Sequence, residues 1–288
     1  MRVLEESRDN GDGTNRPILS ETSNSEYGTG KWDDSYRPHC PAPTWAVECS
    51  DLRLRYPRQR DEALAGVNLQ IPCGAFCGLF GRNGAGKTSL LALLAGLRRP
   101  SSGSLRVFGE DPWENSRITS QIAFAYTKDN LDATIYTIEA RELLRMGPLF
   151  RPRWDAGFAS HLIERFKIPL KKAANKMSKG QAAALRCVIA LASRAPLTIF
   201  DEAYLGMDAV YRQAFLDELL ADFTAHPRTV IFSTHYISEM ERLFSEVAII
   251  DAGRVVLQAD ADELRANGKT LQDTFIGLTL QEGESYDY

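Results

Sequence analysis

The sequence of 288 residues lacks several features that would place it in other classes of protein. It contains no run of about eighteen apolar residues, so no segment has the pattern of a membrane-spanning helix. Its first ten residues, MRVLEESRDN, lack the apolar core of a secretion signal. Basic residues are not in excess, because 34 lysines and arginines stand against 38 aspartates and glutamates. The net charge of −4 argues against nucleic acid as a partner, and we expect a cytoplasmic protein unless a partner tethers it to a membrane.

Cysteine is also scarce, and its distribution is irregular. The five cysteines form an odd, scattered set: Cys40, Cys49, Cys73, Cys77 and Cys187. The spacing of Cys73 and Cys77 could suggest a metal pair, but no second cluster of cysteine or histidine completes four ligands. We favour buried, reduced thiols in a reducing compartment.

The sequence does contain ample material for a core. With 44% apolar and 25% charged residues, it is typical of a soluble globular protein. Residues 1–43 are polar, so we expect them to be disordered or loosely attached. We expect one globular domain over residues 44–266 and a short acidic tail over 267–288, which ends in EGESYDY. No internal repeat is evident.

Apolar runs separated by helical patterns predict an α/β fold. Strands are expected at 45–56, 65–71, 76–80, 105–108, 122–126, 197–200, 230–232 and 247–250. Helices are expected at 87–97 and 182–192. The interval 138–176 also has a helical pattern, and we place it in a helical insertion that extends to about 195. Strands that alternate with helices, several of them continuous apolar runs, indicate a mainly parallel sheet covered on both faces.

One segment matches a phosphate-binding pattern in full. Residues 81–88, GRNGAGKT, fit G-x-x-x-x-G-K-[ST], with an apolar strand before them and an apolar helix after them. The glycines let several backbone N–H groups turn toward one anion, and the helix that begins at Lys87 adds the positive end of its dipole. A plain glycine-rich turn is the alternative, and we disfavour it because strand, loop and helix all agree. The predicted nucleotide-binding residues of this loop are Gly81, Arg82, Asn83, Gly84, Ala85, Gly86, Lys87, Thr88 and Ser89.

Two of these residues have individual predicted roles, as do two carboxylates elsewhere in the chain. We expect Lys87 to reach the β- and γ-phosphates and the Thr88 hydroxyl to ligate Mg²⁺. Asp201 and Glu202 follow the apolar run 197–200. Asp201 is placed to hold Mg²⁺, and Glu202 to polarise the attacking water. A strand that simply ends in solvated acids is the common alternative, but the phosphate loop favours the functional interpretation.

Four further motifs resemble those of the ABC ATPases. Residues 177–181, MSKGQ, are similar to the signature sequence of that family. Residues 206–208, GMD, look like its D-loop, and residues 233–235, STH, look like its switch histidine. Tyr56 matches the aromatic residue that stacks on adenine. The resemblance extends from about residue 45 to 264, which is nearly the whole of the expected globular part.

The resemblance implies a fold, cofactors and partners. The fold would be a P-loop NTPase core with a mainly parallel sheet, an N-terminal antiparallel β part and a helical insertion subdomain. ATP and Mg²⁺ would be bound, and a second nucleotide-binding subunit, identical or related, would close on the first with two ATP molecules between them. Catalysis would involve Glu202, His235 and Lys87. Contacts to the ATP of the opposite subunit would come from Ser178, Lys179, Gly180 and Gln181, next to the D-loop residue Asp208.

Each of these motifs also has a purely structural alternative. Ser178 and Gln181 form a capping-box pattern at the start of a helix, and both interpretations can hold because an open helix end is a good γ-phosphate ligand. His235 could be a hydrogen-bonded residue at the end of a strand. Tyr56 could be an aromatic residue of the core or of a sheet edge.

The sequence departs from the family pattern at several positions. Thr127 stands where the family has a metal-binding, coupling glutamine, and Lys179 replaces a glycine of the signature. Ala203 and Tyr204 replace a proline and a small polar residue. None of these changes removes the phosphate loop or the two carboxylates, so we expect an active ATPase with an atypical coupling region.

The resemblance implies the ATP-binding and ATP-hydrolysing subunit of an ABC transporter. It would lie on the inner face of the cell membrane and energise a separate permease, docked on the helical insertion near residues 127–144. Subunits of two-component exporters are the most similar type, and importer subunits come next. A soluble ABC-type ATPase that acts as an assembly or regulatory scaffold is the alternative. A P-loop kinase is disfavoured, because it leaves residues 178–181 and His235 unexplained.

Overall fold

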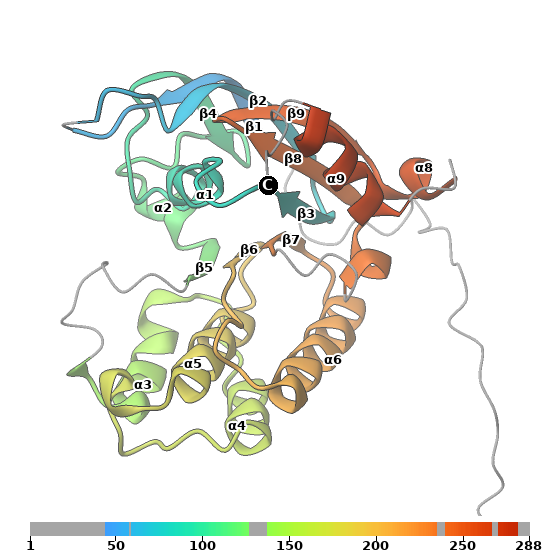
Figure 1. Ribbon diagram of the computed structural model, residues 1–288. Coiled ribbons are helices and arrows are strands. Elements are labelled where there is room, and N and C mark those ends of the chain that lie inside the picture. Colours follow the sequence, from blue (N-terminus) through green and yellow to red (C-terminus); the bar gives the residue numbers. More distant parts are fainter. Residues whose placement is uncertain (1–43, 58, 127–136, 235–239, 267–269, 282–288) are drawn as a thin grey trace, which may run out of the picture. The chain divides into compact units, whose positions relative to one another are not determined.

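The computed structural model describes residues 44–57, 59–126, 137–234, 240–266 and 270–281, all within one unit of the chain that spans residues 37–288 (Figure 1). The expected N-terminal extension 1–43, Thr127 and His235 therefore lie outside the described residues. No helix in the described ranges is both long enough and apolar enough to span a membrane.

A small antiparallel sheet forms the first part of the described chain. Its strand order is β2-β1-β4, and the strands are β1 (Trp45–Leu54), β2 (Leu64–Pro72) and β4 (Ser102–Val107). On β2 the buried residues Val67, Leu69 and Ile71 alternate with more exposed ones, so only one face of this strand enters the core. The N-terminal antiparallel part that the family resemblance implied is confirmed.

The main sheet has the strand order β5-β6-β7-β3-β8-β9. Its strands are β3 (Phe76–Phe80), β5 (Ile122–Tyr126), β6 (Leu197–Asp201), β7 (Thr229–Ser233), β8 (Glu246–Asp251) and β9 (Arg254–Asp260). The pairs from β5 to β8 are parallel, and β9 alone pairs antiparallel. Every residue of β3, β6 and β7 is buried, as expected for parallel strands covered on both faces. The predicted α/β class and mainly parallel sheet are confirmed.

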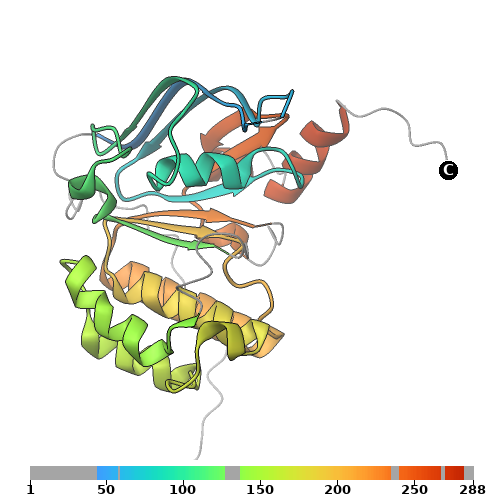
Figure 2. The same cartoon turned by 90° about the vertical axis from the view of Figure 1, so that its left-hand side faces the viewer.

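Helices cover both faces of the main sheet. They are α1 (Lys87–Leu94), α2 (Ser116–Thr119), α3 (Ala140–Phe150), α4 (Ala156–Arg165), α5 (Lys179–Ala192), α6 (Ala209–Ala225), α8 (Ala261–Ala266) and α9 (Leu271–Gln281), with short 3₁₀ turns at Ala174–Lys176 and Glu241–Leu243. Helices α3 to α6 lie on one side of the sheet, whereas α1 and the antiparallel sheet lie on the other (Figures 1 and 2). The sheet thus separates two apolar cores, one built with α5 and α6 and one built with α1.

Strand β9 and the range 267–288 are among the segments that differ from the expectation. Strand β9 was not predicted, because its residues alternate between exposed and half-buried positions at the edge of the sheet. The range 267–288 was expected to be only a tail, yet it contains helix α9. Leu271 is buried there, and Phe275 and Leu278 pack on the same core. The three residues recur at helical spacing and form one apolar face, and apart from Asp273 the acidic residues of this range come after the helix.

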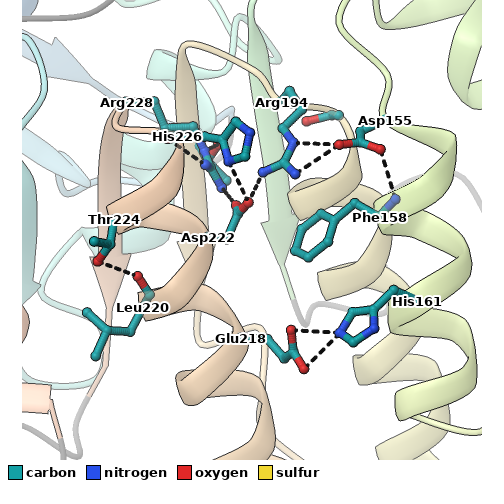
Figure 3. Close-up of polar contacts among 12 residues, drawn as sticks. Asp155, Phe158, His161, Arg194, Glu218, Leu220, Asp222, Thr224, His226 and Arg228 are labelled. Carbon is teal, nitrogen blue, oxygen red and sulfur yellow. Dashed lines mark hydrogen bonds and ion pairs between the residues drawn. The ribbon is translucent and has the colours of Figure 1, made fainter.

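A buried network of charged side chains ties α4, α6 and the ends of two strands together (Figure 3). Asp222, near the end of α6, accepts a hydrogen bond of 2.7 Å from Arg228 and forms an ion pair with Arg194. Arg194 also donates to Asp155, the N-cap residue of α4, over 3.2 and 2.9 Å. The network therefore holds the helical insertion onto the sheet at the end opposite to the phosphate loop.

Four of the five cysteines lie in the described part of the chain. Cys49, Cys73, Cys77 and Cys187 are all buried free thiols, as we expected, and Cys40 lies outside the described ranges. Across those ranges, no group of three or more His, Cys, Asp or Glu side chains is arranged to hold a metal.

Candidate nucleotide-binding site

The phosphate loop connects β3 to α1, and two of its glycines are needed for close packing. A Cβ atom on Gly81 would lie 2.4 Å from the carbonyl oxygen of Ile250. A Cβ atom on Gly86 would lie 2.7 Å from the carbonyl oxygen of Ala63, and Gly86 has φ of 111°. Gly84 also has positive φ, at 84°, but a Cβ atom there would meet nothing within 4 Å. The core therefore packs closely against the loop at Gly81 and Gly86, whereas the tip at Gly84 is open.

The exposure of the other loop residues also separates an exposed tip from a buried base. Arg82, Asn83 and Gly84 are exposed at the tip, whereas Ala85 is buried and Thr88 and Ser89 are half-buried. A tip of exposed backbone followed by the N-terminus of α1 is a geometry that accepts phosphate oxygens. The residues present therefore fit a bound nucleoside triphosphate.

Lys87 lies inside this loop. Its Nζ donates hydrogen bonds of 2.6 Å to the carbonyl of Gly81 and 3.1 Å to the carbonyl of Arg82, and the residue is only 7% exposed. Burial lowers the pKa of Lys87, while the negative charges of Glu202 and Asp201 act in the opposite direction. The ammonium group thus lies in the field of both predicted carboxylates.

Asp201 ends β6 and is 5% exposed. Burial raises the pKa of its carboxyl group, and a hydrogen bond with the Thr88 side chain acts against that rise. The contact places one carboxylate and one hydroxyl oxygen side by side at the start of α1. Magnesium is usually held by one or two protein oxygens together with phosphate oxygens and water, so this pair fits a Mg²⁺ ion that accompanies a nucleotide.

Glu202 follows in a strained conformation. Its φ is 49°, which is unusual for a residue other than glycine, and its N–H donates a 3.1 Å hydrogen bond to the carbonyl of Ser233 at the end of β7. Such strain is found where the surrounding structure enforces it, often at functional sites. The conformation turns the chain away from the strand immediately after Asp201.

The signature residues and the D-loop form a second group. Ser178 caps α5, and the predicted capping box is confirmed: Gln181 N–H donates to Ser178 Oγ, and Ser178 N–H donates to Gln181 Oε1, each over 3.2 Å. A Cβ atom on Gly180 would lie 2.9 Å from the carbonyl oxygen of Gly206, so helix and D-loop touch here. Lys179 is exposed beside this contact.

Asp208 has a structural role of its own. It caps α6 by accepting a hydrogen bond of 2.9 Å from the N–H of Tyr211. The capping contact fixes the chain between Gly206 and the start of the helix.

Tyr56 lies against the first turn of α1. Its hydroxyl group and the Ser89 hydroxyl are 3.0 Å apart, and the guanidinium carbon of Arg98 lies 4.8 Å from the centre of its ring. An open pocket of about 280 Å³ beside the ring is lined by Arg98, Trp113 and neighbouring residues. Arg98 was not among the predicted site residues, because a contact between residues so far apart in the chain leaves no local pattern.

The structure thus brings Lys87, Thr88, Asp201 and Glu202 together at one end of the parallel strands, with Tyr56 beside Ser89. Ligands of α/β proteins bind in such a position, beyond the carboxyl ends of the strands.

Comparisons with known proteins agree with a nucleotide-binding site at this position. The model of the ABC transporter family matches residues 64–205. The Nod factor export ATP-binding protein I of Cupriavidus pinatubonensis is 32% identical over 237 residues, which are 78% of this chain and 69% of that protein. The aliphatic sulfonates import ATP-binding protein SsuB of Rhodopseudomonas palustris is 31% identical over 237 residues, 80% of each chain.

The fold also matches solved structures. An ATP-binding subunit of an ABC transporter superposes with a TM-score of 0.70 at 24% identity, over 81% of this chain and 99% of that one. Family model, relatives and fold agree with the geometry of the phosphate loop and its carboxylates. The chain therefore belongs to the ABC transporter family, as one of its ATP-binding and ATP-hydrolysing subunits.

Proposed function

We propose that this chain drives a separate membrane permease through closing and opening of a pair of nucleotide-binding subunits. The observation that carries the proposal is the convergence of Lys87 and two carboxylates, Asp201 and Glu202, on the phosphate loop. A cation, a metal-binding oxygen pair and a second carboxylate are the groups that phosphoryl transfer to water requires.

The roles of the individual residues follow from their positions. The backbone of residues 81–89 would bind the phosphates, and Lys87 would exchange its hydrogen bonds with Gly81 and Arg82 for bonds to phosphate oxygens. Thr88 and Asp201 would hold Mg²⁺, which neutralises developing negative charge when it is bound. Glu202 would orient and polarise the attacking water, and we assign the γ-phosphate contact to His235. Tyr56 would stack on the adenine.

A second subunit would complete the site. The N-terminus of α5, with its capping box and exposed Lys179, offers backbone N–H groups and a positive charge to an anion. We propose that this end, residues 178–181, contacts the ATP of the other subunit, and that Asp208 lies at the junction.

The permease would dock on the helical insertion, on the inner face of the cell membrane. Helix α3 supports this proposal, because Leu149 and Phe150 at its C-terminal end are 78% and 62% exposed. Large adjacent apolar side chains on a surface are typical of a protein contact. We propose export as the direction of transport, because the Nod factor relative is an export protein. Import is the alternative, because the sulfonate relative is an import protein.

The test uses the full-length chain in its native membranes. We expect tagged protein, extracted with detergent, to co-purify with a polytopic membrane protein. Glu202→Gln should retain ATP binding, lose most turnover and accumulate as a closed dimer. Glu164→Gln, on an exposed position of α4, is the matched control and should behave as wild type. Recovery only in the soluble fraction, with no membrane partner, would instead support the scaffold function.

A further inference from the structure

Tyr204 is one of the residues at which the sequence departs from the family pattern, and it is buried in the core. It is 2% exposed, and its ring packs on Phe215 and Phe232 with centroid separations of 6.4 and 5.5 Å. Its hydroxyl group forms a hydrogen bond with Oγ1 of Thr234, which is also 2% exposed. The packing alone would be served by phenylalanine, the residue found at both neighbouring ring positions.

The hydrogen bond joins two strand ends. Tyr204 lies just beyond the end of β6, and Thr234 directly follows β7. The same two strand ends are already linked by the bond of 3.1 Å from Glu202 N–H to the Ser233 carbonyl. The segment that contains Glu202 is therefore linked to β7 through the backbone of Glu202 and also through the Tyr204 side chain.

This second attachment bears on the strained conformation of Glu202. A φ of 49° persists only where neighbouring contacts enforce it. The turn itself adds two backbone bonds, from Leu205 N–H to the Glu202 carbonyl and from Met207 N–H to the Tyr204 carbonyl, of 3.0 and 3.1 Å. Neither of these bonds reaches β7. The tyrosine hydroxyl thus links the residues after Glu202 to the neighbouring strand.

We propose that Tyr204 is a positioning residue for ATP hydrolysis, whose hydroxyl group, through Thr234, holds the turn that directs the Glu202 carboxylate. The proposal rests on the role of Glu202 proposed above. In this role Tyr204 acts through the turn, and not by contact with the nucleotide or the water. Because the alignment of a reacting group controls the rate strongly, a turn that shifts by a fraction of an ångström changes turnover while the phosphate loop still binds ATP.

The experiment is a double-mutant cycle with Tyr204→Phe and Thr234→Val, measured by single-turnover hydrolysis and by equilibrium ATP binding. We expect each single variant to hydrolyse ATP about tenfold more slowly, in line with the loss of one hydrogen bond in a dry site, with unchanged ATP affinity. The double variant should be no slower than either single variant, because both remove the same contact. Thr234→Ser keeps the hydroxyl and should retain the wild-type rate, which provides a test even if Tyr204→Phe does not fold.

Thr198→Val is the matched control for general destabilisation. Thr198 is a fully buried threonine near the other end of β6, and its hydroxyl accepts a hydrogen bond of 3.2 Å from Arg228. This variant should lower the thermal midpoint without slowing hydrolysis. Unchanged rates in Tyr204→Phe and Thr234→Val, additive losses in the double variant, or an equal loss in Thr198→Val would overturn the proposal. The Glu202→Gln variant separates the two proposals. If it hydrolyses ATP at the wild-type rate, the proposed role of Glu202 is wrong, and so is that of Tyr204. If it is inactive while Tyr204→Phe and Thr234→Val keep the wild-type rate, only the proposed role of Tyr204 is wrong.

Discussion

The carboxylate of Asp222 accepts a 2.7 Å hydrogen bond from Arg228, with the two side chains only 2% and 5% exposed (Figure 3). Arg194 forms an ion pair with the other oxygen. Burial lowers the pKa of Arg228 to about 10, so the guanidinium group depends on this carboxylate for compensation. The Asp222 carboxylate thus pairs with both Arg194 and Arg228.

The first prediction concerns the loss of that anion. Asp222→Asn should destabilise the protein by about 3–5 kcal/mol, because it leaves the buried Arg228 without its counter-charge. Urea unfolding would measure the change. Asp217→Asn, on the exposed face of the same helix, is the control and should cost about 0.5 kcal/mol or less. Equal unfolding free energies for wild type and Asp222→Asn would contradict the role of the network.

The second prediction separates two glycines of the phosphate loop. Gly86→Ala should abolish measurable ATP binding, because the new Cβ atom would meet the Ala63 carbonyl at 2.7 Å and the backbone has φ of 111°. In Gly84→Ala the new Cβ atom would have no neighbouring atom within 4 Å. This variant should therefore lose only about 1–2 kcal/mol of binding free energy, through the strain of an alanine at positive φ. Calorimetric titration with ATP would compare them. Similar affinities in both variants would show that the close approach at Gly86 is unimportant.

The third prediction concerns thiol reactivity. Burial raises the pKa of Cys49 and of Cys187 to about 12, and it also raises the pKa of Cys77. Since the thiolate is the reactive form, these cysteines should not react with a thiol reagent at pH 8 in the native protein. Cys73 is buried as well, so a Cys40→Ser variant should remain unlabelled until denaturant is added, and should then show four reactive thiols. Rapid labelling of the folded variant would mean that a buried cysteine becomes exposed.

Much of the fold could be predicted because its signals are local. The strands at 76–80 and 122–126 have the bounds that their apolar runs indicated, and α1 begins at Lys87 as the loop pattern requires. The capping box at Ser178 was also visible, since all of its residues lie within one turn. Parallel core strands and phosphate loops are the elements with the strongest short-range patterns.

The remaining features depend on contacts between distant segments. Strand β9 has no continuous apolar run because it lies at the edge of the sheet. The position of Arg98 over Tyr56 and the bond from Tyr204 to Thr234 join residues that are far apart in the chain. Such pairings arise from tertiary packing, which propensity and periodicity do not encode.

The fourth prediction is a pH dependence of stability. Glu246, at the start of β8, faces Asp260 and Glu263, and burial together with their charges raises its pKa from 4.5 to about 7. The folded state therefore binds this proton more tightly than the unfolded state, so the stabilisation is present below pH 4.5 and is lost as the pH rises through about 7. Glu246→Gln should remove this loss and raise the thermal midpoint at pH 8, with a smaller effect near pH 5. Melting curves that differ from wild type by the same amount at every pH would contradict it.

The fifth prediction tests the base site at Tyr56. Tyr56→Ala should weaken ATP binding about tenfold, because base–aromatic stacking contributes about 1–3 kcal/mol. It should leave the affinity for inorganic tripolyphosphate unchanged, since that ligand has no base. Tyr56→Phe keeps the ring and loses only the hydroxyl contact with Ser89, so it should bind ATP nearly as wild type does. Arg98→Ala removes the cation from the ring and should have an intermediate effect on ATP alone. If Tyr56→Ala weakens both ligands equally, the tyrosine supports the loop rather than the base, and its contact with Ser89 becomes the relevant one.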